Sequence, residues 1–574
     1  MATLIEDRRA VLLIIATLVM AMVSTLTGLY LSTLVNEKRS VDDTRLTVQA
    51  MNLGNAGVNH AMAELRKRIA VDLAAKVENI STNAIFTAYA ADPLGLLNNL
   101  TYINASNQFA LNANHTQATL ILPSVYTLTG TEGNYGNTTI KVTKANTTSS
   151  DTVADVYKFY YTFTVESTGN VTRYAVPIQK RVIYAPTNIE IDFRRDNFAK
   201  YALFTTLHYT TDNKVVWFTN NTNFQGPVHT NTRFAFSGNP SAHFTDEASQ
   251  YRSNVTFDNN GHNITILNDH NNSTDVPIFD KGLTRGAENI TLSSTLNQTQ
   301  MKAQVLGSMT EPGTNGVWVA NDGTHCVGGI YIKGGTGSSD NANITMSVDG
   351  SSRQVYVIRQ SSTTKTIAVD AANNRTTVTA GSNITNYTGI PDGVRHEGIL
   401  IYSNDDIGRF NGTVQSGTKA IISSAKNITI VGNVTYDSYS SSPLSAEGSD
   451  NLLGILAWTG NVTISTDAPD NLQVHGVVMA PQGVFQVACY NCSAYGDRGV
   501  VTLLGGMITQ NYGTFGTFSD HDGDTGYGRN FVYDTRMGEG MAPPYFPYMK
   551  NFTSILVPDD VLRQKPAWQE KDIP

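Results

Sequence analysis

Residues 11–35 read VLLIIATLVMAMVSTLTGLYLSTLV, a run of 25 positions without a charged side chain. As an α-helix this run is about 38 Å long, which is enough to cross a lipid bilayer with some tilt. It is longer than the ~7–15-residue apolar core of a secretory signal peptide, and no small-x-small cleavage site closes it. The run therefore predicts a helix that is buried in a membrane or among other helices.

Residues 36–78 continue the same helix with a different pattern. Charged side chains gather directly after the apolar run, in residues 37–45. Beyond them, apolar residues recur at mostly three- or four-residue intervals, the spacing of one face of an α-helix. This predicted stripe consists of Val48, Met51, Val58, Met62, Leu65, Ile69 and Leu73. Residues 11–78 are therefore predicted to form one helical stem with an apolar first half and an amphipathic second half.

The ten residues before the apolar run, MATLIEDRRA, are charged and end in Ala10. A charged leader, one small residue and then a hydrophobic helix resembles the cleavage site of type IV prepilins, in particular of archaeal ones, which tolerate Ala before the cut. The resemblance implies cleavage between Ala10 and Val11, which would make Ile15 the fifth mature residue. Major bacterial pilins carry Glu there, so the resemblance leaves a minor or tip pilin, an archaeal pilin-like protein or an uncleaved membrane anchor.

Residues 41–65, VDDTRLTVQAMNLGNAGVNHAMAEL, resemble the stem of PilX-type minor pilins. In that family a charged stretch leads to a short box of small residues and Glu. Here the box is residues 53–57, with Asn55 where the family has Glu. The resemblance implies a pilus-associated role, and a signal-anchor helix on an unrelated surface protein is the alternative.

The composition of the 574-residue chain is typical of an exported β-protein. Charged residues make up 15% of it and the net charge is −8, so no basic surface for nucleic acid is predicted. Thr, Asn, Gly and Tyr are plentiful, and turn residues separate short β-branched runs. The length allows several domains with substantial cores.

Asn-x-Ser/Thr sequons are more frequent than chance allows. With 52 Asn, 69 Thr and 39 Ser, random placement predicts about ten sequons, whereas 24 occur and 20 of them end in Thr. The excess predicts N-glycosylation and an exported surface, and an archaeal cell surface suits it. Repeated β-turn composition is the alternative, because Asn and Thr are frequent in turns. The candidate glycosylation sites are Asn79, Asn99, Asn104, Asn114, Asn137, Asn146, Asn170, Asn220, Asn254, Asn263, Asn289, Asn297, Asn343, Asn374, Asn383, Asn411, Asn427, Asn433, Asn461 and Asn551.

The predicted fold class is mainly β with a long N-terminal α-helix. After a leader (1–10) and the stem (11–78), residues 80–195 contain short alternating strands and are predicted to be a small β domain. Residues 196–395 form a β-rich middle region, and residues 557–574 form a C-terminal tail. In residues 396–556, apolar runs recur about every 20–30 residues with Gly or Asn at the corners, which favours an irregular parallel β-solenoid. β-Sandwich domains are the alternative.

Residues 196–550 contain the strings KYALFT, GPVHTN, SGNP, DNLLGILA, APDNLQVHGVVMAPQGVF and GYGRNFVYDTRM, the last followed by PPYFP. Together these strings resemble an uncharacterised β-rich domain that accompanies PilX-type stems in bacterial surface and pilus-associated proteins. The resemblance implies a pilus-associated or cell-surface role and no known chemistry. The many sequons are a departure from the bacterial members.

Three cysteines are too few for a disulfide-built scaffold. Cys489 and Cys492 lie three positions apart in a loop-like CYNC segment, and outside the cell a local disulfide is the expected state. Asp520, Asp522 and Asp524 alternate in SDHDGDTGYG, which suits a calcium loop because Ca²⁺ takes ~6–8 oxygen ligands. A solvated acidic turn is the alternative.

No enzyme activity is predicted. Asp405 and Asp406 are the best candidates for a carbohydrate-cleaving acid and base, but neighbouring strand residues point to opposite faces, so a surface turn is expected. His229 and His475 lie in strand-like runs and are predicted to be hydrogen-bonded structural histidines. The chain holds no GxSxG, HExxH, P-loop or GxGxxG segment in a usable context. The aromatic residues in 531–548 are predicted to cover the last solenoid rung, with stacking on sugars or a partner subunit as the alternative.

The sequence predicts a pilin-like, N-glycosylated cell-surface structural or adhesion protein, anchored in a membrane or filament by its N-terminal helix. Its predicted partners are membrane lipid or other pilin-like subunits at the stem, and surface glycans or a host or neighbouring cell at the head, with no nucleic acid. Ca²⁺ is the one cofactor considered. The alternatives are a surface-anchored β-solenoid enzyme acting on polysaccharides and a membrane-anchored envelope-layer glycoprotein. A mature chain that starts at Val11 indicates prepilin processing, whereas one that starts at Met1 or Ala2 indicates an anchor.

Overall fold

The structure is a computed structural model in which strands predominate behind one long N-terminal helix, which confirms the predicted fold class. The chain divides into two compact units: unit 1 consists of residues 1–194 and 551–574, and unit 2 of residues 195–550. The residues described are 2–101, 109–122, 126–127, 133–144, 149–151, 156–173, 176–219, 222–238, 241–259, 262–266, 275–292, 297–335, 337, 341–519, 522–557 and 568–571.

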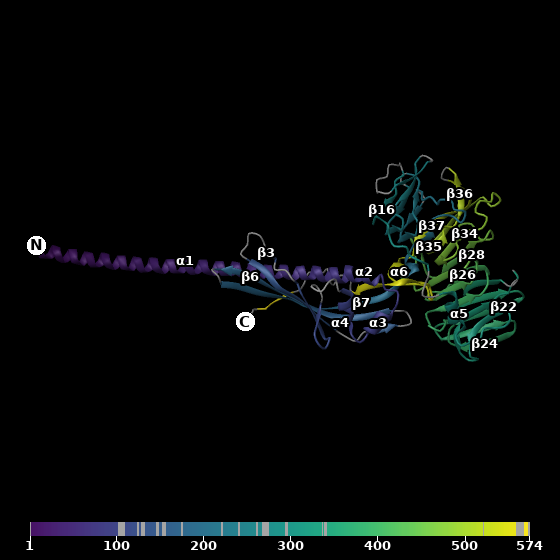
Figure 1. Cartoon of the computed structure of the whole chain (residues 1–574), viewed down its shortest axis with the longest axis horizontal. Coiled ribbons are helices and arrows are strands. Elements are labelled where there is room, and N and C mark those ends of the chain that lie inside the picture. Colours follow the sequence, from purple (N-terminus) through teal and green to yellow (C-terminus); the bar gives the residue numbers. More distant parts are fainter. Residues whose placement is uncertain are drawn as a thin grey trace. The chain divides into compact units, whose positions relative to one another are not determined.

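Unit 1 begins with helix α1 (Ala2–Arg66), which runs on through a π-helical segment (Lys67–Leu73) into α2 (Ala74–Val77) (Figure 1). The predicted stem is therefore helical almost to its end. Two short helices follow, α3 (Ala84–Ala88) and α4 (Pro93–Thr101). α4 begins with Pro93, whose missing N–H costs nothing in the first turn, and Asp92 just before it accepts a hydrogen bond from the Gly95 N–H at 3.0 Å.

One largely antiparallel sheet forms the rest of unit 1, and the second half of α1 packs on it. Strands β6 and β7 are long, and alternate β6 residues such as Tyr157, Phe159, Tyr161 and Phe163 are buried, as the alternation in the sequence predicts. The sheet consists of β1 (Ala110–Leu111), β2 (Gln117–Ile121), β3 (Tyr126–Thr127), β4 (Gly133–Lys144), β5 (Ser149–Asp151), β6 (Val156–Arg173), β7 (Val176–Asn197), β38 (Tyr548–Val557) and β39 (Trp568–Lys571).

Unit 2 is an insertion in unit 1, between the two neighbouring strands β7 and β38. β39 also pairs with β7, with Trp568 opposite Tyr184. The described part of the predicted C-terminal tail is therefore a strand of the first sheet. The pairing of β38 and β39 with β7 could not be predicted from the sequence, because both strands lie more than 350 residues from β7.

Unit 2 is built mainly from parallel strands that stack in columns, which is the arrangement of a β-solenoid. Sheet 1 contains ten parallel strands in the spatial order β19 (Cys326–Lys333), β25 (Ile399–Ser403), β27 (Lys419–Ser424), β31 (Leu452–Ala457), β33 (Gln473–Ala480), β35 (Asp497–Asn511), β8 (Leu203–Leu207), β10 (Val228–Thr230), β13 (Ala248–Gln250) and β17 (Leu283–Arg285).

Sheet 2 is a second parallel column alongside the first. It contains β20 (Ala342–Val348), β26 (Ile407–Val414), β28 (Ile428–Tyr436), β32 (Val462–Ile464) and β34 (Phe485–Val487). Smaller sheets are formed by β9 (Thr222–Phe224), β12 (Ala242–Phe244) and β16 (Ile278–Phe279), by β11 (Ala235–Phe236), β14 (Val255–Asn259) and β15 (His262–Ile266), and by β29 (Ser440–Ser441) and β30 (Leu444–Ser445).

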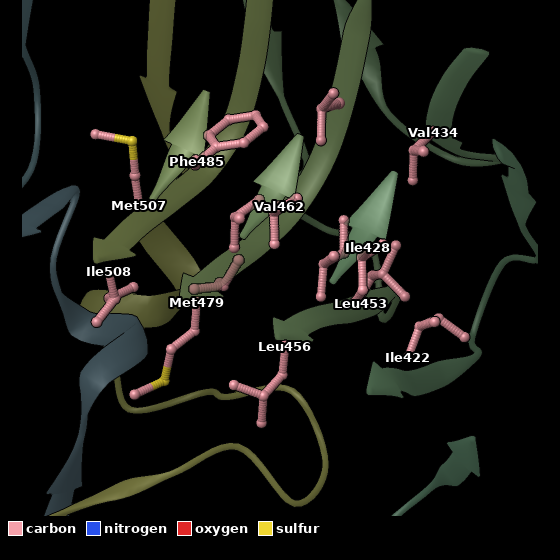
Figure 2. Close-up of a cluster of buried hydrophobic side chains, with 14 of the residues drawn as sticks. Ile422, Ile428, Val434, Leu453, Leu456, Val462, Met479, Phe485, Met507 and Ile508 are labelled. Carbon is pink, nitrogen blue, oxygen red and sulfur yellow. The ribbon is translucent and has the colours of Figure 1, made fainter. Parts of the chain in front are cut away.

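Paired positions of the stacked strands carry aliphatic side chains. Across the ten strands of sheet 1 the aligned residues are Ile330, Ile401, Ile422, Ile455, Val478, Met507, Leu203, Val228, Ala248 and Leu283, and all but Leu283 are at most 2% exposed. We call this row the aliphatic ladder. In sheet 2, Ile428, Val462 and Phe485 lie in a row across adjacent strands, with Ile422 and Met507 in the same cluster (Figure 2). Parallel pairing in register places each side chain on its equivalent one rung away.

The solenoid does not follow the order of the chain. The last rung, β35, pairs with the first strand of unit 2, β8, so residues 203–285 stack on the end of sheet 1 and not ahead of its start. The chain then passes from β17 at one end of the stack to α5 (Gln298–Leu306) and β19 at the other (Figure 1). Residues 196–395 and 396–550 therefore lie in one compact unit, because these pairings join them, whereas residues 551–556 of the predicted solenoid region belong to β38 and unit 1.

The end of the stack near β19 is closed by antiparallel strands. β18 (Gly316–Asn321) pairs with β19, and β20 continues into a meander of β21 (Gln354–Gln360), β22 (Thr363–Asp370), β23 (Arg375–Ala380) and β24 (Asn383–Thr388). Beside β35, the strands β36 (Gly516–Ser519) and β37 (Asp522–Tyr533) pair with each other, and β37 pairs with β35. Unit 2 also contains a 3₁₀ turn (Phe198–Lys200) and the short helix α6 (Thr535–Gly538).

The segment 543–546 lies elsewhere than predicted. Residues 531–533 do belong to β37, beside the last rung β35, but Pro544 lies against Gly398, and Pro543 and Phe546 lie against Gly454, in the middle of sheet 1. A Cβ atom at Gly398 or Gly454 would meet these side chains at 3.0–3.2 Å. The absence of a side chain at Gly398 and Gly454 therefore lets Pro543, Pro544 and Phe546 pack closely against the backbone there.

We predict that Ile455→Ala, in the centre of the aliphatic ladder, lowers the free energy of unfolding of unit 2 by about 2–5 kcal/mol. The matched variant Ile384→Ala removes the same atoms from a side chain that is 66% exposed and should change stability by less than about 0.5 kcal/mol. Urea unfolding of the full chain in detergent measures both. Equal effects of the two substitutions would contradict the ladder.

Candidate functional site

The first half of α1 has an apolar surface with no cover inside the chain. The large apolar side chains between Val11 and Val35 are 42–71% exposed. Among the described residues, α1 and its continuation form a helix long and apolar enough to cross a membrane, and its most apolar segment contains no buried residue. A soluble single chain rarely exposes so large an apolar surface. This half of α1 is the candidate functional site (Figure 1).

The threonine side chains within this surface bond to the helix itself. The hydroxyls of Thr17, Thr25, Thr27 and Thr33 each donate to the carbonyl oxygen four residues earlier, at 2.6–2.9 Å. A hydroxyl without a partner is costly in hydrocarbon, and these bonds remove that cost. The helix can therefore be surrounded by apolar groups on every side along the run.

The second half of α1 is held on the sheet by a contact between small residues. Gly54 lies under Val182, where an added Cβ would be 2.6 Å from Cγ2, and a Cβ on Gly57 would fall on the Ser167 hydroxyl. From the other side, a Cβ on Gly169 of β6 would fall on the carbonyl oxygen of Ala50. The box of residues 53–57 is thus the place where helix and sheet backbones approach each other most closely.

Five of the seven residues of the predicted apolar stripe are buried in this contact, Met51 is half-buried and one residue is exposed. Val58, Met62, Leu65, Ile69 and Leu73 are at most 5% exposed, whereas Val48 is 52% exposed. The placement of Val48 in the buried stripe was wrong, because Leu46 and Ala50 on either side of it pack towards the sheet and Val48 faces away from it. The predicted cleavage position between Ala10 and Val11 lies within α1, and both residues are exposed.

Two candidate glycosylation sites belong to a stack of polar side chains at one corner of the solenoid. Asp406 Oδ1 accepts hydrogen bonds from the backbone N–H and the Nδ2 of Asn427, both at 2.9 Å. Asn427 Oδ1 accepts from the Asn461 N–H at 2.9 Å, and Asn461 Oδ1 accepts from the Val484 N–H at 3.0 Å. We call this stack the asparagine ladder. In the sequence, Asp406, Asn427, Asn461 and Val484 each directly precede a buried aliphatic or aromatic residue of sheet 2. This pattern could have been used to predict the stack.

The other candidate sequons occupy several kinds of surface. Asn170, Asn254, Asn343, Asn411 and Asn551 are half-buried, and Asn297 caps helix α5 by accepting from the Gln300 N–H. Asn104, Asn146 and Asn220 lie outside the described residues, as do the side chains of Asn137 and Asn263. The exposed ones are Asn79, Asn99, Asn114, Asn289, Asn297, Asn374, Asn383 and Asn433.

The carboxylates considered for carbohydrate cleavage have structural partners. Asp405 is 6% exposed and lies 2.6 Å from Lys426 Nζ, while Asp406 belongs to the asparagine ladder. Both lie in the turn that leads from β25 into β26. Their oxygens are thus engaged with neighbouring rungs.

Cys489 and Cys492 form a disulfide with a Cα–Cα distance of 5.2 Å. The third cysteine, Cys326, is a half-buried free thiol, and burial raises its pKa. For the predicted calcium loop, Asp520 and the side chain of Asp522 lie outside the described residues, and Asp524 is exposed. Within the described part of the chain, no group of three or more His, Cys, Asp or Glu side chains is arranged to hold a metal ion.

Both histidines predicted to be structural are buried. His229 lies 2.8 Å from Ser249 Oγ and 3.0 Å from Asn231 Oδ1, and His475 Nδ1 accepts from the Tyr436 N–H at 3.1 Å. Burial lowers the pKa of each to about 4. His208 was not among the histidines predicted from the sequence to be structural. It is buried among aromatic rings, and burial lowers its pKa to about 3.

A polar hollow of about 300 Å³ lies on unit 1, lined by Tyr89, Asp92, Asn99, His115 and neighbouring residues. Asp92 and His115 pair at 2.7 Å, and Asn99 Nδ2 donates to the Tyr89 hydroxyl at 3.3 Å. These side chains satisfy one another, and the hollow carries no arrangement for covalent chemistry.

Comparison with known proteins gives one match over part of the chain and no function. Residues 157–258 match a family described as a domain of unknown function (DUF4900). The match covers 102 of the 574 residues, runs from β6 into β14 and includes the strings KYALFT and GPVHTN. No curated protein and no solved structure matches the chain. The resemblance to PilX-type stems therefore stays a prediction.

We predict that Gly57→Leu separates the second half of α1 from the sheet, because its side chain would occupy the position of Ser167 and Thr138. Overpacking at such a contact costs about 1–3 kcal/mol or more, and the unfolding temperature of unit 1 should fall. The matched variant Gly28→Leu, in the exposed half of the same helix, has no atom within 4 Å of the added Cβ and should leave that temperature unchanged. Differential scanning calorimetry of the full chain in detergent distinguishes them.

We predict that unit 2 loses stability as the pH falls from 6.5 towards 4. An unfolded histidine takes up a proton near pH 6.5, whereas buried His475 does so only near pH 4, so its contribution is complete above 6.5 and is lost in this window. His475→Asn keeps an acceptor near the Tyr436 N–H and cannot be protonated. At pH 4.5 the unfolding free energy of unit 2 should have fallen by on the order of 2 kcal/mol less in the His475→Asn variant than in the wild type. Identical pH profiles of the two proteins would contradict the assignment.

Proposed function

We propose that this protein is a pilin-like structural protein of the cell surface, held in a membrane or a filament by the first half of α1. One observation carries the proposal: the same helix is packed into unit 1 along its second half and uncovered along its apolar first half. Removing a 25-residue apolar run from water is worth on the order of tens of kcal/mol. Only lipid or other apolar helices can supply that burial.

The packing of α1 in unit 1 favours a permanent anchor over a signal sequence that is removed after export. A signal sequence is discarded after export, so its helix has no reason to continue into the fold of the mature protein. Here α1 contributes Leu53, Val58, Met62 and Leu65 to the cores of unit 1, and removing it would expose the sheet. The helix is therefore a permanent part of the protein, and the leader, residues 1–10, is the part proposed to be cleaved.

The units beyond the helix would be displayed outside the cell. The 24 sequons all lie after residue 78, and the Cys489–Cys492 disulfide suits an oxidising compartment. We propose a structural or adhesive role for this head and no enzymatic one, since the oxygens of Asp405 and Asp406 bind neighbouring rungs. Surface glycans and neighbouring cells are its proposed partners. An envelope-layer glycoprotein with an uncleaved anchor is the second candidate, favoured by the same apolar helix.

Val23→Arg places a charge in the middle of the apolar run, where insertion scales give a cost of about 2.5–3.5 kcal/mol. We expect the variant to leave the membrane or filament fraction of its native cell. Val41→Arg is the matched control, because Val41 is 67% exposed on the same helix but lies beyond the run. Fractionation and immunoblotting measure both, and a Val23→Arg protein that sediments like the control would overturn the proposal.

The N-terminus of the membrane-fraction protein separates the two candidates. A chain starting at Val11 supports prepilin processing, and a chain starting at Met1 or Ala2 supports the uncleaved anchor. Peptide mass spectrometry of the same samples gives the answer.

A further inference from the structure

Strand β24 is the outer strand of the antiparallel meander of unit 2. It pairs along its length with β23, with Thr379 opposite Ile384 and Thr377 opposite Asn386. On its other side, the described residues make one isolated bridge, between Thr388 and His325 at the strand end. Five of its six residues are exposed, and Ile384 is 66% exposed. The N–H and C=O groups along this edge are free to pair with another strand.

This edge lacks the protection that proteins usually give to such strands. Natural edges are blocked by charged side chains, prolines or bulges, because an open edge templates pairing with a second chain. Residues 383–388 read NITNYT, six uncharged residues without proline, and the paired residues 375–380 read RTTVTA, with one charge at the end of the pairing. Short windows of high β-propensity and no charge are the sequence signature of aggregation.

The strand itself contains two sequons, Asn383-Ile384-Thr385 and Asn386-Tyr387-Thr388. We propose that N-linked glycans on Asn383 and Asn386 cover the β24 edge and prevent edge-to-edge pairing, an inference that rests on the proposed export of the head. The two asparagines are three residues apart, so their side chains point to opposite faces of the strand. Glycans on the two residues would therefore cover both faces. Asn386 Oδ1 accepts from the Thr377 hydroxyl at 2.8 Å, which orients the amide with Nδ2 available.

The modification needs a lipid-linked oligosaccharide phosphate as donor. A bond forms between the asparagine Nδ2 and the anomeric carbon of the first sugar, and the bond from that carbon to the phosphate oxygen breaks. Nδ2 loses a proton, and the lipid phosphate leaves. Both acceptor side chains are on an exposed strand, so an enzyme can reach them in the folded protein.

The chain offers a control with the same tripeptide. Asn427-Ile428-Thr429 also reads NIT, but Ile428 is fully buried in sheet 2 and Asn427 Nδ2 donates to Asp406 in the asparagine ladder. A glycan on Asn427 would break the ladder and displace a rung. Sequence alone treats the two sites as equal, whereas the structure assigns a glycan to Asn383 and none to Asn427.

Glycopeptide mass spectrometry of the protein from its native source tests the assignment. We expect glycans on Asn383 and Asn386 and an unmodified Asn427. Bare Asn383 and Asn386 in a chain that carries glycans elsewhere would overturn this inference and leave the proposed function standing. Glycans on Asn383 in a protein that is released from the membrane would support this inference and overturn the proposed function. Equal occupancy of Asn383 and Asn427 would also overturn the inference.

The shielding role is tested with Thr385→Ala/Thr388→Ala, which removes both sequons and keeps both asparagines. The matched variant Thr385→Ser/Thr388→Ser loses the same methyl groups and keeps the sequons. In light scattering of the detergent-solubilised full chain, we expect dimers and larger species for the alanine variant and the wild-type distribution for the serine variant. Adding Ile384→Lys to the alanine variant should restore that distribution, because a lysine blocks the edge directly. An alanine variant with wild-type unfolding temperature and no added association would overturn the shielding role.

Discussion

Helix α1 packs into unit 1 only as far as the sheet reaches, and this limit decides what the rest of the helix must do. Gly54, Gly57 and Gly169 let the helix and sheet backbones approach closely, and Leu46 is the first residue of α1 that packs against this contact. The large apolar side chains from Val11 to Val35 are all exposed, and the threonine hydroxyls bond to the helix backbone. The fold thus leaves one large apolar surface that only molecules outside the chain can bury.

Unit 2 rests on a second form of apolar burial, the repetition of one side-chain position across parallel strands. The aliphatic ladder joins strands that are as far apart in the chain as Met507 and Leu203, because in-register pairing depends on the rung and not on the length of the loop before it. Loops between rungs can therefore vary, which explains the irregular spacing of the apolar runs. Stacking the first strand on the last rung also brings the ends of unit 2 together, where the Arg195 guanidinium donates to the Lys550 carbonyl oxygen. Ends that lie close together are what an insertion between two neighbouring strands requires.

Asparagine has two roles in this chain, and they are distinguished by what the side-chain amide contacts. In the asparagine ladder, the amides of Asn427 and Asn461 satisfy backbone and side-chain groups of the next rung. At β24, the asparagines stand on an exposed edge. The sequons therefore include some that form turns of the solenoid and some that lie on exposed surface.

The sequence by itself determined the long helix with its two halves, the predominance of strands, the parallel solenoid character of the C-terminal region and the local CYNC loop. Each of these depends on residues that are close together in the chain, such as the uncharged run 11–35 or the apolar-polar alternation from Tyr157 to Phe163. Only the tertiary structure decided that unit 2 interrupts unit 1, that β8 stacks on β35, that Val48 is exposed and that Asn427 differs from Asn383. These outcomes depend on pairings between distant segments. A strand carries little information about its partner when many strands share the same β-branched pattern, so the partner is selected only when all the rungs pack together.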